Sequence, residues 1–163
     1  MLIGFYHPFC NGGGGGERVL WKVIETLAKL DPSSKSSVEQ EDEDSDSDID
    51  YVAAGTISIQ IYTCDPTPLP LILANVLLKF QITIPSTLSL STVLVPNGAS
   101  LLSAASYPRF TMVGQSLGAM FFAYKALLNS GATPDVFFDT TGCAFTFPVA
   151  KLFSLLTSRK NCR

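Results

Sequence analysis

Apolar and polar positions along the chain follow two alternating periods, which predict strands interleaved with helices. Leu2 to Tyr6 is a short apolar run of the kind found in a strand covered on both faces. From Glu17 to Leu30 the apolar positions recur every three or four residues, which predicts an amphipathic helix that Asp31-Pro32 ends. Apolar residues then alternate with polar ones from Ile57 to Tyr62, as in a second strand.

The rest of the chain continues this succession of strands and helices. Such an order favours an α/β fold, an open parallel sheet of Rossmann type that is covered on both sides. The expected elements are a helix over Leu69 to Phe80, short strands over Gln81 to Ile84 and Ser91 to Val95, a strand or extended entry over Phe110 to Gly114, a buried helix over Leu117 to Leu128, a strand over Asp135 to Asp139 and an amphipathic segment from Phe147 to about Leu156.

Composition and charge fit one folded domain that carries a polar insertion. The 163 residues are 47% hydrophobic and 15% charged, which is enough apolar content to bury a core. The net charge is −3, but eight of the fourteen acids lie between Glu39 and Asp50, so the rest of the chain is mildly basic. Because residues 33–50 contain almost no apolar side chains, we expect them to be a disordered acidic insertion.

Cysteine spacing and the apolar runs exclude several classes of protein. The cysteines at positions 10, 64, 143 and 162 lack the spacing of a metal site, so free thiols in a reducing compartment are expected. The N-terminus lacks the basic region and the long apolar run of a secretory signal peptide. The apolar stretch Leu69 to Ile84 is interrupted by polar residues and is shorter than the ~20 residues of a membrane span, which favours a core or interfacial helix.

The strongest local signal is a run of glycines, Gly12, Gly13, Gly14, Gly15 and Gly16, between the first strand and the first helix. Five glycines in a row are expected to form a loop, because their backbone entropy disfavours regular structure. Backbone N–H groups there, next to a helix N-terminus, suit a phosphate or a sugar hydroxyl. The run ends in Glu17-Arg18 and matches neither the ATP-binding nor the dinucleotide-binding glycine pattern, so both ligands are disfavoured. The alternative is that the glycines only permit a tight turn.

Three side chains near expected strand ends or the glycine run are candidate ligand contacts. His7 follows the first strand directly, at the edge where open α/β sheets bind ligands, and either contacts a substrate or only makes structural hydrogen bonds. Asp139, at the end of a later strand, either accepts a hydrogen bond from a sugar or caps the next turn. Arg18 does not suit the positive end of a helix and is therefore expected to reach for an anion.

The segment Gly114-Gln115-Ser116-Leu117-Gly118 has the spacing of the nucleophile elbow of serine hydrolases. Such an enzyme needs a histidine later in the chain, whereas His7 is the only histidine and lies far upstream. The alternative is that the two glycines allow close packing and Ser116 caps a helix. A serine hydrolase is therefore the weakest of the functional hypotheses.

Three blocks of residues together resemble one family. The blocks are His7 to Trp21 with its glycine run, Tyr107 to Gly118 and Pro134 to Pro148. They resemble the N-terminal part of the endoplasmic-reticulum α-1,2-mannosyltransferases that extend the dolichol-pyrophosphate-linked oligosaccharide during N-glycan assembly.

The resemblance implies a GT-B glycosyltransferase with two Rossmann-like domains, the first facing a lipid-linked acceptor and the second holding the donor GDP-mannose. It implies retaining transfer of α-1,2-linked mannose at the cytosolic face of the endoplasmic reticulum, with no bound metal or other cofactor. The implied partners are the lipid-linked oligosaccharide, the membrane surface and further mannosyltransferases of the pathway, and no nucleic acid is implied.

On this interpretation residues 1–153 are the acceptor-side domain and residues 154–163 are a divergent tail. The donor-binding domain and the family's anchoring helix are expected to be absent, so the chain would be an inactive fragment. By resemblance, Gly12 to Gly16 would approach the acceptor's pyrophosphate or sugar and the edge of the donor diphosphate. His7 and Arg18 would support that contact, and Asp139 would complete the binding site.

A second hypothesis assigns the chain a function of a different class. The chain would then be a non-catalytic module that binds lipid or a partner through the apolar helix expected over Leu69 to Phe80.

Overall fold

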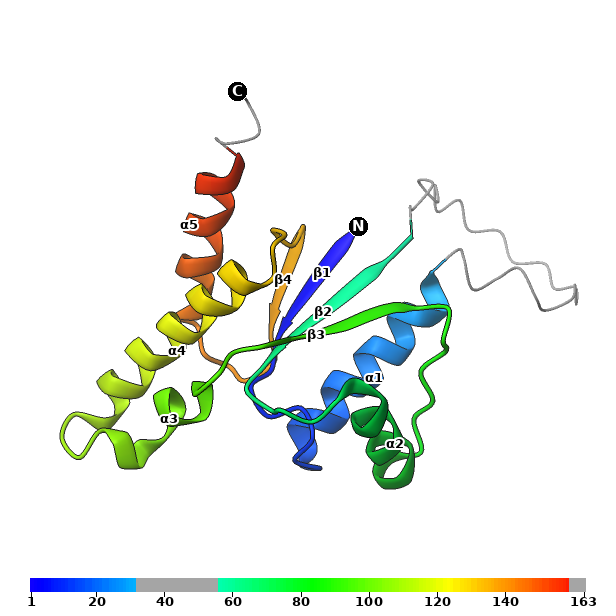
Figure 1. Ribbon diagram of the computed structural model, residues 1–163, viewed down its shortest axis with the longest axis horizontal. Coiled ribbons are helices and arrows are strands. Elements are labelled where there is room, and N and C mark those ends of the chain that lie inside the picture. The colour runs from blue at the N-terminus through cyan, green and yellow to red at the C-terminus, as the bar shows by residue number, and fades with distance from the viewer. Residues whose placement is uncertain (32–55, 159–163) are drawn as a thin grey trace, which may run out of the picture.

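The computed structural model describes residues 1–31 and 56–158, which form a four-stranded sheet with helices on both faces (Figure 1). The expected acidic insertion at 33–50 lies outside the described residues. The strands pair in the order β3-β2-β1-β4, and every pairing is parallel. This confirms the predicted open α/β sheet. Because all strands are parallel, their C-terminal ends lie at one edge of the sheet, the carboxyl edge. The strands are β1 (Leu2–Tyr6), β2 (Ser58–Thr63), β3 (Ser89–Leu94) and β4 (Val136–Asp139).

The helices form two layers that cover opposite faces of the sheet (Figure 1). One layer contains α1 and α2, which connect neighbouring strands, and the other contains α4 and α5. A short helix, α3, and one turn of 3-10 helix over Ala104–Ser106 precede α4. The helix bounds are α1 (Gly15–Leu30), α2 (Leu69–Phe80), α3 (Gly98–Leu102), α4 (Thr111–Asn129) and α5 (Thr146–Ser158).

Alternation along β1 and β2 divides the core between these two layers. Ile3 and Phe5 of β1 belong to the cluster that packs under α1 and α2. Tyr6 and Tyr62, one position out of phase with those residues, belong to the cluster under α4 and α5. Because both faces of β1 are buried, its sequence is apolar without alternation, as expected for a central parallel strand.

The N-terminal half of α4 departs from the sequence prediction. The strand or extended entry expected over Phe110 to Gly114 is wrong, because the helix begins at Thr111, directly after Phe110 with φ 57°. Ser116 is inside this helix and donates its hydroxyl to the Met112 carbonyl oxygen at 2.8 Å, so it does not cap the helix. The strand-to-helix turn of a nucleophile elbow is therefore absent around Ser116, and the hydrolase hypothesis loses its geometric basis.

Gly114 and Gly118 do allow close packing, which was the alternative to a nucleophile elbow. A Cβ at Gly118 would clash with the Leu101 carbonyl oxygen and lie 2.9 Å from the Tyr107 hydroxyl oxygen. A Cβ at Gly114 would clash with the Tyr107 ring. These two positions thus let α4 lie directly against α3 and the turn that follows it.

Two further expectations are corrected. The strand expected over Gln81 to Ile84 is wrong, because Gln81 ends α2 in the left-handed conformation and the next residues have no regular structure. Ile82 is nevertheless buried in the core, which explains its apolar signal. The glycine run is helical from Gly15 onwards, because packing of the buried face of α1 outweighs the low helix propensity of two glycines at its first turn.

Gly118→Ala is expected to lower the free energy of unfolding by about 1–3 kcal/mol, because the new methyl group overpacks the contact between α4 and α3. Chemical denaturation measures the change. Gly15→Ala is the matched control, since a Cβ there meets no atom within 4 Å and the residue is already helical. A Gly118→Ala protein as stable as the Gly15→Ala protein would contradict this packing role.

Candidate functional site

The β1–α1 loop, residues 7–14, is fixed at the carboxyl edge of the sheet by one buried backbone oxygen. The Pro8 carbonyl oxygen accepts hydrogen bonds from the Thr63 hydroxyl at 2.8 Å and from the Cys64 backbone N–H at 2.9 Å. The Cys64 thiol lies 3.1 Å from the same oxygen. The backbone N–H of His7 donates to the Tyr62 carbonyl oxygen at 3.1 Å and thereby extends the β1–β2 ladder. The loop therefore leaves the sheet along a defined path.

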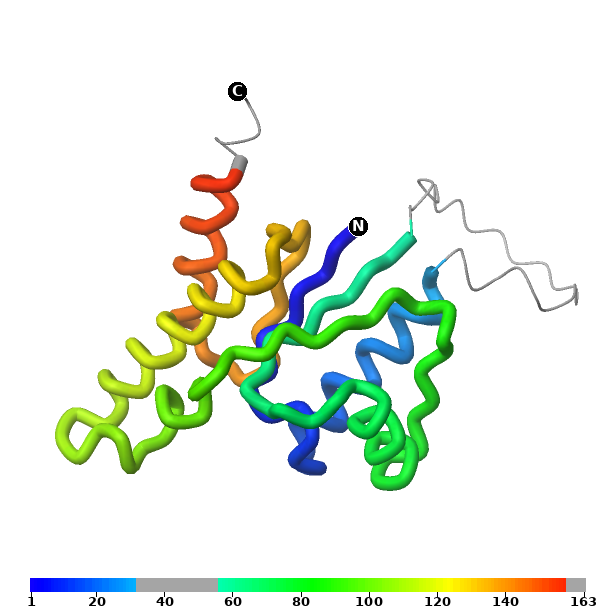
Figure 2. The backbone as a smooth tube through the Cα atoms, viewed as in Figure 1, coloured from blue at the N-terminus to red at the C-terminus, as the bar shows by residue number. Residues whose placement is uncertain are grey.

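Two further contacts hold the middle of this loop against α1 and α2. The indole N–H of Trp21, a fully buried residue of α1, donates to the Cys10 carbonyl oxygen at 3.2 Å. The side chain of Asn11 accepts from Asn75 of α2 at 3.0 Å and donates to the Thr67 hydroxyl at 3.4 Å. In Figure 2 the loop lies in dark blue at the lower edge of the sheet, where α1 begins.

The glycines that follow are exposed and end at the N-terminus of α1. Gly14 is the N-cap residue, and because it has no side chain, no side-chain hydrogen bond caps α1 at this position. The N–H groups of the first helical turn have no partner four residues earlier in the helix, and they lie at the positive end of the helix dipole. Gly13 has φ +88°, a conformation that favours glycine. The loop therefore presents main-chain donors with little side-chain cover of its own.

Two charged side chains from the helices lie against the glycines. A Cβ at Gly12 would lie 2.5 Å from a carboxylate oxygen of Glu17, and one at Gly14 would lie 2.8 Å from the other oxygen. A Cβ at Gly13 would lie 3.0 Å from the ammonium nitrogen of Lys79, which also donates to the Asn11 carbonyl oxygen at 3.3 Å. The absence of side chains in the loop thus allows one anion and one cation to approach its backbone.

His7 lies beside the glycines and is almost completely buried, with 5% of its surface exposed. Its Cε1 would be 3.7 Å from a Cβ at Gly16. Its Nδ1 is 2.6 Å from the Thr140 hydroxyl oxygen, and that hydroxyl donates to the Tyr6 carbonyl oxygen at 3.0 Å. With the single proton of the Thr140 hydroxyl directed to the Tyr6 oxygen, this geometry favours the tautomer in which Nδ1 donates to Thr140.

Burial sets the protonation of His7. The loss of solvent lowers the pKa of the imidazole below its ordinary value of 6.5, and the negative charges of Glu17 and Asp139 and a backbone hydrogen bond with Phe9 act in the opposite direction. The ring is therefore neutral at pH 7 in the free protein. An anion bound nearby would favour the charged form and raise this pKa.

Asp139 acts on the site through the loop after β4. One of its carboxylate oxygens accepts from the Thr141 hydroxyl at 2.7 Å and from the Thr141 backbone N–H at 2.8 Å. The other accepts from the Thr146 hydroxyl at 2.6 Å. These hydrogen bonds cap the turn that follows β4, which is one of the two roles expected for Asp139, the other being a hydrogen bond to a sugar. The capped loop contains Thr140, so Asp139 helps to position the partner of His7.

Arg18 is not brought to His7. Its exposed side chain lines an open pocket of about 320 Å³ between α1 and the residues that follow α2, together with Lys22 and Gln81. The cation that the structure places on the glycine loop is Lys79 instead. The structure therefore places His7 beside Gly16, the last glycine of the run, and Lys79 rather than Arg18 beside Gly13.

Sequence reasoning missed Lys79, although a signal for it exists. Asn75 and Lys79 are four residues apart in an otherwise apolar helix, so they lie on the same side of α2. Both contact Asn11. Polar residues at this spacing in an apolar helix indicate a second polar surface to which the helix packs, and here that surface is the β1–α1 loop.

A hollow of about 480 Å³ adjoins the site on the α4 side of the carboxyl edge. Pro8 and Phe9 of the β1–α1 loop form one wall, and Met112 and Gln115 of α4 form another. Tyr6 contributes to the lining, and its hydroxyl is buried without a hydrogen-bond partner among the described residues. Burial raises the pKa of this phenol far above its usual range, so the hydroxyl stays protonated and is a free donor.

The protonation of His7 yields a direct prediction. Because His7 is the only histidine in the sequence, its ring proton gives one unambiguous NMR signal, expected to titrate with a midpoint below 6.5. The unfolded chain then binds a proton at a higher pH than the folded chain, so stability falls as the pH drops through 6.5 and below. His7→Gln removes that part of the pH dependence. A midpoint above 6.5 would contradict the account of burial.

Comparisons with known proteins agree with this geometry. The family described as ALG11 mannosyltransferase N-terminus matches residues 1–159. A relative from Dictyostelium discoideum is 34% identical over 93% of this chain and 25% of its own length, and one from Homo sapiens is 32% identical over 93% and 25%. A relative from Neurospora crassa is 35% identical over 88% and 21%. Each is named GDP-Man:Man(3)GlcNAc(2)-PP-Dol alpha-1,2-mannosyltransferase.

The chain spans about a quarter of the length of these curated relatives. No solved structure matches the chain. None of the helices over residues 1–31 and 56–158 has the length and apolar content needed to cross a membrane. With a family match over almost the whole sequence and a parallel sheet that carries the glycine loop at its carboxyl edge, the chain belongs to the ALG11 mannosyltransferase N-terminal family.

Proposed function

We propose that this chain is the acceptor-side domain of an enzyme that transfers α-1,2-linked mannose from GDP-mannose to a dolichol-pyrophosphate-linked oligosaccharide. The observation that carries the proposal is the match of residues 1–159 to the family, with relatives that bear the printed name of this reaction. Because the chain spans a quarter of those relatives, the transfer itself requires the remaining lobe to hold the donor. The chain alone binds and positions the acceptor.

The acceptor's pyrophosphate lies against the N-terminus of α1 in this proposal. The exposed N–H groups of Gly15 and Gly16 donate to its oxygens, and Lys79 supplies a positive charge above Gly13. The Glu17 carboxylate lies over the same loop and repels an anion, so it turns outward when the pyrophosphate binds. His7 becomes more basic beside the bound anion and donates from Nε2 as an imidazolium.

The carbohydrate part of the acceptor extends into the hollow next to His7. Its lining combines apolar side chains such as Phe9 and Met112 with polar residues such as Gln115 and Thr141. Sugars present both apolar faces and hydroxyl groups, so this mixed lining suits them. The bond between mannose and GDP breaks during transfer, so charge develops on the leaving GDP and not on the acceptor's pyrophosphate. The contacts in the hollow therefore act by orienting the sugars next to the pyrophosphate, which restricts where the reacting hydroxyl at the far end of the oligosaccharide lies.

The proposal includes a cellular setting. The acceptor is anchored in a lipid bilayer by its dolichol, so the domain works at a membrane surface, which we take to be the cytosolic face of the endoplasmic reticulum. Further mannosyltransferases of the same pathway are proposed to act next to it, because its acceptor must already carry mannose when it arrives. The relatives' printed names, which specify a Man(3)GlcNAc(2)-PP-Dol acceptor, support this order.

Pyrophosphate binding can be tested on the chain itself. Titration with inorganic pyrophosphate is expected to shift the backbone amide NMR signals of Gly14, Gly15 and Gly16 and to raise the midpoint of the His7 titration. Lys79→Met is expected to weaken binding roughly tenfold or more, since it removes a charged hydrogen bond donor. Glu17→Gln is expected to strengthen binding, because a repelling charge is removed. Shifts confined to other parts of the chain would reject this anion site.

Mannose transfer is tested in a chimera in which residues 1–158 replace the matching N-terminal part of the Homo sapiens relative. The chimera is expected to extend lipid-linked Man(3)GlcNAc(2) with labelled GDP-mannose in microsomes. Gly13→Val is expected to reduce transfer at least tenfold, because φ +88° and the close Lys79 side chain both oppose a β-branched residue.

The control for the chimera is Ser86→Ala, at an exposed position in the turn before β3. It should transfer mannose like the unaltered chimera. If a well-folded unaltered chimera fails to extend the acceptor, the proposed function is wrong.

A further inference from the structure

Helix α4 has apolar side chains on most of its circumference, although it is packed only toward the sheet, α3 and α5. Its buried side, which includes Gly118, Phe122 and Ala126, faces the sheet and α3. The opposite side is exposed, with Val113 at 59% and Leu117 at 60% of their surface accessible. A helix that is apolar all round is normally buried on all sides. The exposed side of α4 is therefore a surface that something covers.

The surface continues onto α5, and we call it the α4–α5 face. Between the two helices runs a groove of about 320 Å³ whose lining is almost entirely apolar. The face is defined by Val113, Leu117, Phe121 and Tyr124 of α4 and by Leu152 and Leu156 of α5, all of them exposed.

The apolar surface reaches the carboxyl edge of the sheet. Helix α4 begins at that edge, where Phe110 and Met112 are 84% and 83% exposed. Met112 also lines the hollow beside His7. The α4–α5 face is thus continuous with the entrance to the candidate site, and whatever covers the face lies next to the ligand of that site.

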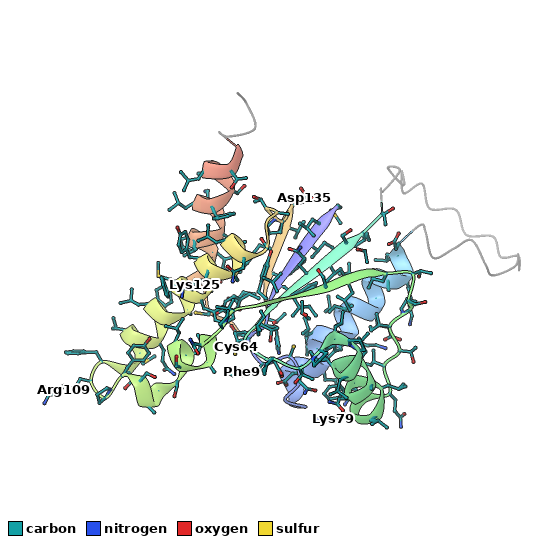
Figure 3. The ribbon with its side chains drawn as sticks, viewed as in Figure 1. Phe9, Cys64, Lys79, Arg109, Lys125 and Asp135 are labelled. Carbon is teal, nitrogen blue, oxygen red and sulfur yellow. The ribbon has the colours of Figure 1, made fainter. Side chains whose placement is uncertain are left out.

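The charged side chains that the two helices themselves carry have one sign, although Asp135 lines a pocket with Phe153 of α5 and Asp139 accepts a hydrogen bond from Thr146 at the start of α5. Arg109 precedes the start of α4, and Lys125 lies in its C-terminal half, with its ammonium 4.9 Å from the centre of the Phe121 ring (Figure 3). Lys151 is exposed on α5. Neither helix contains an acidic residue. Asp135, the acid nearest to α4 in the sequence, precedes β4 and accepts from the backbone N–H of Leu2 at 2.7 Å.

From these observations we infer that the α4–α5 face binds the surface of a membrane that contains anionic phospholipids, with both helices lying in the interface. Exposed apolar side chains flanked by lysine and arginine, without acids, are what such an interface selects. A second copy of the chain fits less well, because a symmetric dimer on this face would bring lysines together, and neither α4 nor α5 supplies an acid to pair with them. The link to the acceptor's own membrane rests on the proposed function, whereas the lipid contact does not.

The same considerations disfavour α2, the helix that was the lipid-binding candidate in the sequence. Its Ile72 and Val76 are buried in the core, and Lys79 is engaged at the glycine loop. Leu71, Leu77 and Leu78 of α2 are 54%, 50% and 80% exposed, but none of them lines the hollow beside His7 or the groove between α4 and α5. This makes Leu78 a matched control for the face, since it is at least as accessible as the residues under test.

Flotation of the 163-residue chain with lipid vesicles tests the inference. The chain is expected to float with phosphatidylcholine vesicles that contain phosphatidylserine, and to float less with phosphatidylcholine alone. Phe121→Glu and Leu152→Glu are each expected to lower the partition coefficient roughly tenfold or more, because each removes a large apolar side chain from the interface. Leu78→Glu should bind like the unaltered chain.

Two lysine variants test the electrostatic part of the membrane contact and leave the apolar side chains unchanged. Lys125→Gln and Lys151→Gln are each expected to reduce binding to the anionic vesicles roughly fivefold and to leave binding to phosphatidylcholine nearly unchanged. Circular dichroism and thermal unfolding confirm that every variant is folded.

Three results would overturn the inference. One is a chain that stays in the soluble fraction with both kinds of vesicle, and another is a loss on Leu78→Glu as large as that on Leu152→Glu. The third is a dimer without vesicles that Leu152→Glu dissociates, which would assign the face to a second copy. Because flotation requires no mannose transfer, and the chimera can be assayed with detergent-solubilised acceptor, failure of this inference and failure of the proposed function are distinguishable.

Discussion

The carbonyl oxygen of Pro8 is the contact on which the site depends. It lies two residues beyond the end of β1, and the Thr63 hydroxyl and the Cys64 backbone N–H both donate to it. These bonds hold the chain at the carboxyl edge of the sheet just before the glycines begin. A flexible run of glycines can present ordered donors only if both of its ends are fixed, and Trp21 and Asn11 complete that fixation on the side of α1 and α2.

The two layers of helices perform different tasks on either side of this edge. The layer of α1 and α2 carries the glycine loop and Lys79, so it provides the polar half of the site. The layer of α4 and α5 carries the hollow and the exposed apolar face. His7 lies between the two halves, since it adjoins Gly16 on one side and bonds to Thr140 after β4 on the other.

Much of the fold could be predicted because its signals are local. The strand Leu2–Tyr6 and the helix Leu69–Phe80 have the predicted bounds, since each is a predominantly apolar segment between turn residues. Phe110 to Gly114 was misjudged because an extended run and a helix that is apolar all round look alike over five residues. In the site, His7 and the glycines could be found from their place after a strand, whereas Lys79 is brought there only by the packing of α2 on the loop.

The most direct test of the central claim is a crystal structure of the chain with a short-chain isoprenyl pyrophosphate. The account predicts pyrophosphate oxygens within hydrogen-bonding distance of the Gly15 and Gly16 N–H groups and of the Lys79 ammonium, with the Glu17 carboxylate turned away from the loop. A pyrophosphate bound elsewhere, with Glu17 still lying over Gly12 and Gly14, would contradict it.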